Sequence, residues 1–225
     1  MRILGVVTDP LTTDELQAMR RSYELGGLSE ADLAPDWLAQ LQRWLGDAHA
    51  AGITEPNAMI LATATPDAVP SARTVLLKGL DDRGLVLFTN LASRKGREAL
   101  ANPAVSLVFP WIDLQRQVVV CGTAQTVDDG QADAYFAARP RRSQLGAAAS
   151  PQSAVIPGRT SLEASLAALD AEYPDGTAVP RPPKWGGFRV IPHSVEFWQG
   201  RRDRLHDRLR YHCDAGAWIV ERLAP

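Results

Sequence analysis

The stretch AMILATATPDAVPSARTVLLKGLDDRGLVLFTN, from Ala58 to Asn90, decides the fold. It contains three short runs rich in apolar and β-branched residues, and turn-forming residues at 66–67 and 81–84 separate them. Such tight connections favour antiparallel strands, because a parallel crossover needs a dozen or more residues. The three strands expected here are Ala58–Thr65, Ser71–Leu80 and Leu85–Asn90.

Strand-like and helix-like runs continue on both sides of this stretch. Five more strands are expected, at Ala104–Trp111, Gln115–Val127, Gly187–Gln199, Leu205–Cys213 and Ala217–Leu223. Helices are expected at Asp14–Tyr23, Pro35–Ala51, Ser93–Ala101, Asp129–Ala149 with an interruption at Pro140, and Ser161–Tyr173. Short sequential strands with tight turns favour a mostly β fold, an antiparallel barrel with flanking helices. We treat residues 35–225 as a single domain and residues 1–34 as an N-terminal segment, because the last three strands are too few to be stable alone.

The composition excludes several classes of protein. The chain has 225 residues, a formal net charge of -2 and 45% hydrophobic residues, which is typical of a globular protein. No overall basic field recruits nucleic acid or an anionic membrane, and no run approaches the roughly 20 apolar residues of a membrane span. The four histidines and two cysteines lack metal-ligand spacing, and no P-loop or dinucleotide fingerprint occurs. We expect a cytoplasmic protein without a metal centre, in which any anion-binding site is local.

Two basic clusters lie near the deciding stretch. Ser93 is a good N-cap, which places Arg94 and Lys95 in a first helical turn, where cations oppose the helix dipole. A phosphate bound to the free N–H groups would remove that penalty. In isolation, two solvated surface charges explain the pattern better. On a regular strand Arg73 and Lys78 point to opposite faces. This arrangement has two explanations. The two cations bind two different anionic groups, or they are simply the charged ends of a half-buried strand.

Two further clusters lie towards the C-terminus. The residues Arg204, His206 and Arg208 are spaced by two, so a strand would place them on one face. That face either binds an anionic ligand, or it belongs to a solvated edge strand whose charges prevent pairing with another chain. Tyr135, Arg139 and Ser143 are spaced by four. Pro140 divides that segment and puts Ser143 in a first helical turn, which suits anion binding, although plain helix packing is the commoner explanation. Four local anion sites without a dinucleotide fold suggest a mononucleotide cofactor and a phosphorylated substrate.

Several blocks of the sequence resemble the pyridoxine/pyridoxamine 5'-phosphate oxidase family. They include RTVLLK at Arg73, FTNLASRKGREALANPAVSLVFPW from Phe88 and EFWQGRRDRLHDRLRY from Glu196, and the resemblance runs from about Arg20 to Pro225. It implies an FMN-binding split barrel that forms a homodimer with active sites at the subunit interface. Residues 1–34 would then be a lid segment.

The resemblance also implies roles for individual residues. FMN would be held by Arg73, Thr74, Val75, Leu76, Leu77, Lys78, Phe88, Thr89, Arg94, Lys95, Gln117, Gln152, Ser153, Trp198 and Arg208. Substrate would be bound by Arg20, Arg21, Ser22, Tyr23, Lys78, Tyr135, Arg139, Ser143, Arg204, Leu205 and His206, of which Arg204 and His206 are the catalytic pair. The chain departs from the family pattern at Ser22, Glu55, Phe88 and Ala148, where Glu, Asp, Tyr and Trp are expected.

The implied reaction is oxidation of pyridoxamine or pyridoxine 5'-phosphate to pyridoxal 5'-phosphate, with O2 as acceptor and H2O2 as product. One alternative is a related flavin oxidase of secondary metabolism, such as a phenazine-type enzyme, which would not need the clamp of Lys78, Tyr135, Arg139 and Ser143. Another is a non-catalytic flavin- or pyridoxal phosphate-binding protein, which would not need Arg204 and His206.

Overall fold

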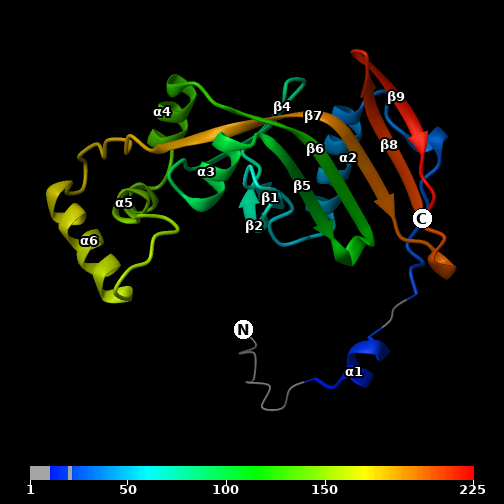
Figure 1. The fold of residues 1–225 in the computed structure, drawn as a ribbon, viewed down its shortest axis with the longest axis horizontal. Coiled ribbons are helices and arrows are strands. Elements are labelled where there is room, and N and C mark those ends of the chain that lie inside the picture. The colour runs from blue at the N-terminus through cyan, green and yellow to red at the C-terminus, as the bar shows by residue number, and fades with distance from the viewer. Residues whose placement is uncertain (1–10, 20–21) are drawn as a thin grey trace.

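The computed structural model describes residues 11–19 and 22–225. Figure 1 shows a curved antiparallel sheet with helices against it and a C-terminal hairpin at one end. Its strands are β1 (Ala58–Ala64), β2 (Pro70–Leu76), β3 (Gly79–Asp81), β4 (Gly84–Asn90), β5 (Ala104–Trp111), β6 (Arg116–Thr126), β7 (Trp185–Gln199), β8 (Asp207–Asp214) and β9 (Ala217–Arg222). The α-helices are α1 (Thr13–Ala18), α2 (Trp37–Ala50), α3 (Arg94–Ala101), α4 (Asp129–Ala137), α5 (Arg141–Ala149) and α6 (Arg159–Glu172).

The sheet is a split barrel, as the sequence predicts. Its hydrogen-bonded order is β2-β1-β5-β6-β7-β4-β3, and β8 and β9 extend from β7. The long strand β7 pairs with β4 through its first half and with β8 through its second half. β2 and β3 end the path without pairing with each other, so the sheet curls without closing.

One predicted strand is in fact two, because the chain changes partner in the middle. The N–H of Leu77 donates to Asn57 O at 2.9 Å and continues the ladder to β1, whereas the N–H of Lys78 donates to Val86 O at 2.8 Å and begins the ladder to β4. The expectation of one regular strand over Ser71–Leu80, with Arg73 and Lys78 on opposite faces, is therefore wrong. Lys78 lies at the corner where the sheet turns.

The core fills the inside of the curved sheet. Helix α2 packs its apolar face there, and the ring of Trp44 meets Phe197 edge-on at 5.2 Å. Asp36 caps α2 by accepting from the N–H of Ala39 at 2.7 Å, so Pro35 precedes the helix instead of opening it. A second, smaller cluster includes Phe136 and Trp185 and lies beneath α4, α5 and α6.

Several other element boundaries differ from expectation by a few residues, and the break at Pro140 agrees with it. The helix expected over Asp14–Tyr23 ends at Ala18. The segment Asp129–Ala149 divides at Pro140 as predicted.

The helices of the described residues include none with the length and hydrophobicity of a membrane span.

The strand expected from Leu205 begins only at Asp207. Asp203 and Arg204 adopt left-handed φ values of 55° and 60°, which turn the chain sharply before β8. Arg204 and His206 thus precede the strand, and the expectation that they share a strand face with Arg208 is wrong.

Candidate functional site

A cavity of about 710 Å³ opens between the corner of the sheet, α3 and α5, and we call it the main pocket. Its lining residues are Thr74, Val75, Leu76, Lys78, Phe88, Thr89, Asn90, Lys95, Tyr135, Arg139, Pro140, Ser143, Gly146, Ala147, Ser150, Gln152 and Trp185. Three of these side chains are cationic and, among the described residues that line the pocket, none is acidic. The pocket therefore favours an anionic ligand.

Lys95 is a buried cation and not a solvated surface charge. Its side chain is 9% exposed, and its Nζ contacts Thr89 Oγ1 at 3.2 Å and Gln152 Oε1 at 3.1 Å. Burial, helped by the nearby Arg73 guanidinium, lowers the pKa of Lys95. Ser93 caps α3 through the N–H of Gly96, as the sequence predicts. The surface-charge explanation thus fails for Lys95, whose ammonium an anion would stabilise.

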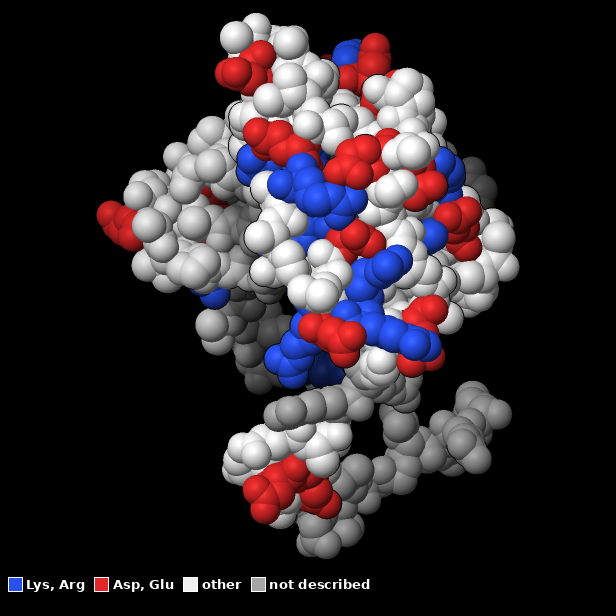
Figure 2. Space-filling view, turned by 90° about the vertical axis from the view of Figure 1, so that its right-hand side faces the viewer, with Lys and Arg blue, Asp and Glu red and all other residues white. Residues whose placement is uncertain are grey.

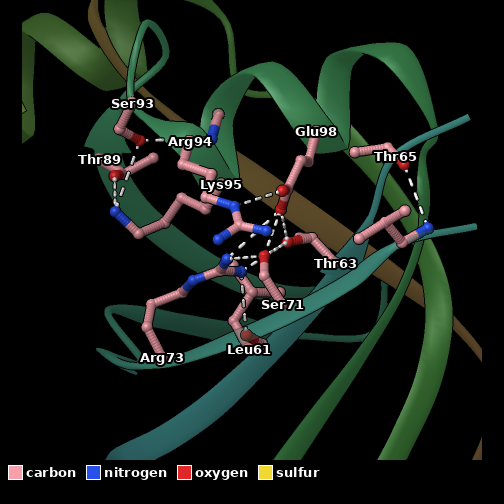
Figure 3. A network of polar contacts seen from close by, with 12 residues as sticks. Leu61, Thr63, Thr65, Ser71, Arg73, Thr89, Ser93, Arg94, Lys95 and Glu98 are labelled. Atoms are coloured by element: carbon pink, nitrogen blue, oxygen red, sulfur yellow. Dashed lines mark hydrogen bonds and ion pairs between the residues drawn. The ribbon is translucent and has the colours of Figure 1, made fainter. Parts of the chain in front are cut away.

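A charged cluster of Arg73, Arg94, Lys95 and Glu98 flanks this pocket (Figure 3). Arg73 donates to Thr63 Oγ1 at 2.6 Å and approaches Glu98 at 3.4 Å, and Arg94 donates through Nε to Glu98 at 2.8 Å. Burial opposes ionisation of Glu98, but hydrogen bonds from Ser71, Thr63 and Arg94 outweigh it and lower its pKa to about 2. Sequence reasoning missed Glu98, although its spacing of four from Arg94 is the signal of a helical ion pair.

Arg139 approaches the main pocket from the junction of α4 and α5. Its Nη1 is buried without a hydrogen-bond partner in the described part of the chain, and its Cζ lies 5.2 Å from the centre of the Trp185 ring. Burial lowers the pKa of this guanidinium. A buried donor without an acceptor is costly, so this one favours a ligand oxygen. Ser143 also lines the pocket from the first turn of α5, but its N–H donates to Pro140 O at 2.8 Å and is not free to bind an anion.

One wall of the main pocket is aromatic. The rings of Phe88 and Tyr135 stack with centroids 4.0 Å apart, and Phe88 stacks on Trp185 at 5.6 Å. Trp185 is 5% exposed and also supports Arg139, yet the sequence analysis did not single it out. A tryptophan at the start of a strand is usually core, and only the fold shows that this one borders a cavity.

A second cavity, of about 430 Å³, lies beside the turn that precedes β8, and we call it the turn pocket. It is lined by Met19, Ser22, Tyr23, Trp198, Arg201, Asp203, Arg204 and His206. The imidazole of His206 lies 4.6 Å from the Trp198 ring and 5.7 Å from that of Tyr23. The N–H of Arg201 donates to His206 Nδ1 at 3.0 Å, so the neutral ring carries its proton on Nε2.

Ion pairs hold the segment before α2 against the C-terminal hairpin. Arg222 pairs with Asp207 and with Glu30, both at 2.8 Å, and Asp207 accepts from the N–H of Leu28 at 3.0 Å. Figure 2 shows side chains of both signs interleaved over this end of the molecule. Residues 22–34 are thereby attached to β8 and β9, beside the turn pocket.

The two pockets lie far apart along one chain. Strand β7 carries Trp185 in the main pocket and Trp198 in the turn pocket, and in Figure 1 it runs from the α4–α6 end to the hairpin end. The thirteen steps between these tryptophans correspond to about 40 Å of strand. A small ligand cannot contact both pockets of one chain.

The structure places some of the predicted site residues in these two pockets and others in neither. Arg208 lines neither pocket, and its guanidinium is held by Glu196 at 2.8 Å and 3.0 Å, so one chain does not bring it to Arg73. Gln117 lies opposite Trp198 in the β6–β7 register. Leu205 is 70% exposed on the turn. Leu77 and Ser153 line neither pocket, and Arg20 and Arg21 fall outside the described residues.

Comparisons with known proteins agree on one family. Residues 45–172 match a family model described as pyridoxamine 5'-phosphate oxidase, and residues 185–225 match one described as the pyridoxine 5'-phosphate oxidase C-terminal dimerisation region. A pyridoxine/pyridoxamine 5'-phosphate oxidase of Salinispora arenicola is 58% identical, over 88% of this chain and 90% of the relative. One of Streptomyces avermitilis is 50% identical, over 97% of this chain and all of the relative.

A solved structure is similar over most of the chain. PhzG from Burkholderia lata, in complex with tetrahydrophenazine-1-carboxylic acid, has a TM-score of 0.82 and 36% identity, covering 87% of this chain and 95% of that one. A pyridoxamine 5'-phosphate oxidase-related, FMN-binding protein of Nostoc punctiforme has a TM-score of 0.67, and at 18% identity it supports the fold alone.

Proposed function

Because the chain belongs to the pyridoxine/pyridoxamine 5'-phosphate oxidase family, we propose that it oxidises pyridoxamine and pyridoxine 5'-phosphates to pyridoxal 5'-phosphate. The observation that carries the proposal concerns two of the three cations in the main pocket, Lys95 and Arg139. Lys95 and Arg139 belong to different elements, and neither has a carboxylate partner among the described residues. Two such cations suit two phosphates, one on a cofactor and one on a substrate.

The residues of the main pocket fit FMN as the cofactor. Lys95 and its neighbours Arg73 and Arg94 supply cations for a phosphomonoester, and Phe88 borders the same cavity. Eight lining residues would hold FMN from this side, namely Thr74, Val75, Leu76, Lys78, Phe88, Thr89, Lys95 and Gln152. We add four neighbours that do not line the pocket, namely Arg73, Leu77, Arg94 and Ser153. These residues would hold FMN, which would supply two-electron redox chemistry for oxidation of the substrate with O2 as the final acceptor.

A homodimer would complete the site. The turn pocket of one chain is too distant to serve its own main pocket, and the model matched by residues 185–225 is described as a dimerisation region. We therefore propose that a second copy presents Arg204 and His206 to the substrate ring, and adds Gln117, Trp198 and Arg208 to the cofactor site. The apolar side chains exposed on β9, Trp218, Ile219 and Val220, are available for such an interface.

The chain's own residues would orient the substrate and balance its charge. Arg139, Lys78, Tyr135 and Ser143 bind the phosphate of the substrate, which fixes its position against the aromatic wall. His206 can donate from Nε2 to an oxygen on the pyridine ring, and Arg204 offsets the negative charge of the ring. Pyridoxine phosphate and O2 would give pyridoxal phosphate and H2O2. With pyridoxamine phosphate, water is also consumed and ammonia is released.

The similarity to PhzG makes a phenazine-type oxidase the second candidate. A tricyclic carboxylic acid would not need Arg139 and Lys78 as a phosphate clamp. Measuring H2O2 release separates the candidates, with pyridoxamine 5'-phosphate and unphosphorylated pyridoxamine compared on the FMN-loaded protein. The proposal expects the phosphate to be strongly preferred, because its absence leaves buried donors unpaired. Equal turnover of both compounds would contradict the phosphate clamp and favour the second candidate.

A further inference from the structure

Glu98 joins three elements around a single carboxylate. It lies on α3, its side chain is 6% exposed, and it accepts hydrogen bonds from Thr63 on β1 and from Ser71 on β2. Arg94, one turn earlier on α3, and Arg73 on β2 approach the same carboxylate (Figure 3). This one anion therefore contacts two of the three cations in the charged cluster.

The contacts leave particular guanidinium donors available. Arg73 uses Nη1 for Leu61 O and Thr63, and Nη2 for Ser71 and Glu98, so its orientation is fixed on both sides. Arg94 is anchored through Nε alone. Within residues 11–19 and 22–225, the Nη groups of Arg94 and the Nε of Arg73 have no protein acceptor. Glu98 thus anchors each guanidinium and leaves donors for a ligand.

The charges of the cluster match one kind of ligand. Arg73, Arg94 and Lys95 carry three positive charges and ionised Glu98 carries one negative charge, which leaves two positive charges. A phosphomonoester above its second pKa of about 6 carries close to two negative charges. Without the carboxylate, three neighbouring cations would repel one another, and the guanidiniums would lose their common anchor.

We propose that Glu98 is a positioning residue, which holds Arg73 and Arg94 at the cofactor's phosphate and matches the cluster to a phosphomonoester dianion. The inference rests on the proposed function, because it takes the charged cluster to be the phosphate site of FMN. Glu98 need not touch the cofactor, since it acts through the two arginines.

A purely structural role for Glu98 makes a different prediction. If the carboxylate only fastens α3 to β1 and β2, its loss disturbs the whole main pocket, and every flavin should bind less well. A positioning role changes only the affinity that depends on the phosphate. FMN and riboflavin separate the two roles, because riboflavin has the same ring system without the phosphate.

The test is a flavin titration of apo-protein, followed by quenching of flavin fluorescence, with Glu98→Gln compared with the wild type. Glutamine keeps the size of the side chain but removes the charge, and it replaces one of the two acceptor oxygens by an amide donor. The Kd for FMN should rise about ten-fold, the loss expected for a charge-assisted hydrogen bond, while the Kd for riboflavin stays within about two-fold. Glu163→Gln, which removes an exposed ion pair on α6, is the matched control and should change neither.

The outcomes separate the inference from the proposed function. If wild-type protein binds FMN no better than riboflavin, the phosphate site fails and the inference fails with it. If the wild type prefers FMN to riboflavin and Glu98→Gln shows the same preference, only the inference is overturned. Equal weakening of both flavins, or tighter binding of FMN, also overturns it. If Glu98→Gln does not fold, Ser71→Ala decides in the same titration, where a smaller loss confined to FMN supports the inference and no loss overturns it.

Discussion

The main pocket and the turn pocket are held together in different ways. Strand ladders and two helices fix the main pocket, where Lys95 is 9% exposed and Arg139 has a buried, unpartnered nitrogen. The turn pocket depends on a short left-handed turn with exposed residues, such as Leu205 at 70%, and on aromatic contacts with Tyr23. Charges in a buried, rigid site bind strongly, whereas exposed groups on a turn can reach another molecule. The difference is what the proposed dimer requires, in which one region would bind the ligands and the other would be presented to a partner subunit.

The largest effect is expected in the turn pocket. Arg204→Ala should lower kcat about 100-fold, which is the loss typical of removing one electrostatic contact to a reacting group. FMN affinity should hardly change, because the proposed site for the cofactor phosphate is at the main pocket. Arg202→Ala is the control, since Arg202 pairs with exposed Glu24 and does not line the turn pocket. Equal losses of turnover and of FMN affinity would mean that Arg204 binds the cofactor, and would contradict the division of roles between the two pockets.

A smaller effect, of a different kind, is expected in the main pocket. Arg139→Ala should raise the KM for pyridoxamine 5'-phosphate about ten-fold, because one charge-assisted contact with the phosphate is lost. Steady-state kinetics over a range of substrate concentrations measure the change. Arg142→Ala, which changes an exposed residue in the first turn of α5, should leave KM unaltered. A fall in kcat with constant KM would contradict a binding role for Arg139.

The smallest effects concern two carboxylates, one beside each pocket. Hydrogen bonds lower the pKa of Glu98 to about 2 against its burial, and a hydrogen bond from Arg222 lowers that of Glu30 to about 2. Each ionised carboxylate therefore stabilises the fold at pH values above 4.5, the pKa of the unfolded state. This contribution to the free energy of unfolding is lost as the pH falls towards 2. Glu30 is 58% exposed and screened by solvent, whereas Glu98 is buried.

Urea unfolding at about pH 5.5 and about pH 3 tests this difference. The wild type should lose stability on acidification, Glu98→Gln should lose clearly less, and Glu30→Gln should resemble the wild type at high salt. If Glu30→Gln removed more of the acid sensitivity than Glu98→Gln, the buried network would not be the stronger of the two.

Local features of this chain were predictable from its sequence. The cap at Ser93 and the break at Pro140 depend on residues within one helical turn, and both occur as expected. The division at Lys78 was missed because it results from an exchange of partner strands that are distant in sequence. The turn at Arg204 was missed because non-glycine residues adopt left-handed conformations there without a sequence signal. Trp185 became visible only when the fold placed it beside the cavity, whereas the spacing of Glu98 from Arg94 was a signal in the sequence that was overlooked.

Complementation between two impaired variants, assayed at a pyridoxamine 5'-phosphate concentration well below the wild-type KM, tests most directly the central claim that each active site is assembled from two subunits. One variant carries Arg139→Ala and Lys78→Ala in the main pocket, and the other carries Arg204→Ala in the turn pocket. After co-expression or mixed refolding, half of the dimers are mixed, and each mixed dimer has one site with both regions intact. The account predicts recovery of about a quarter of wild-type H2O2 release, whereas activity no higher than that of the parent variants would contradict it.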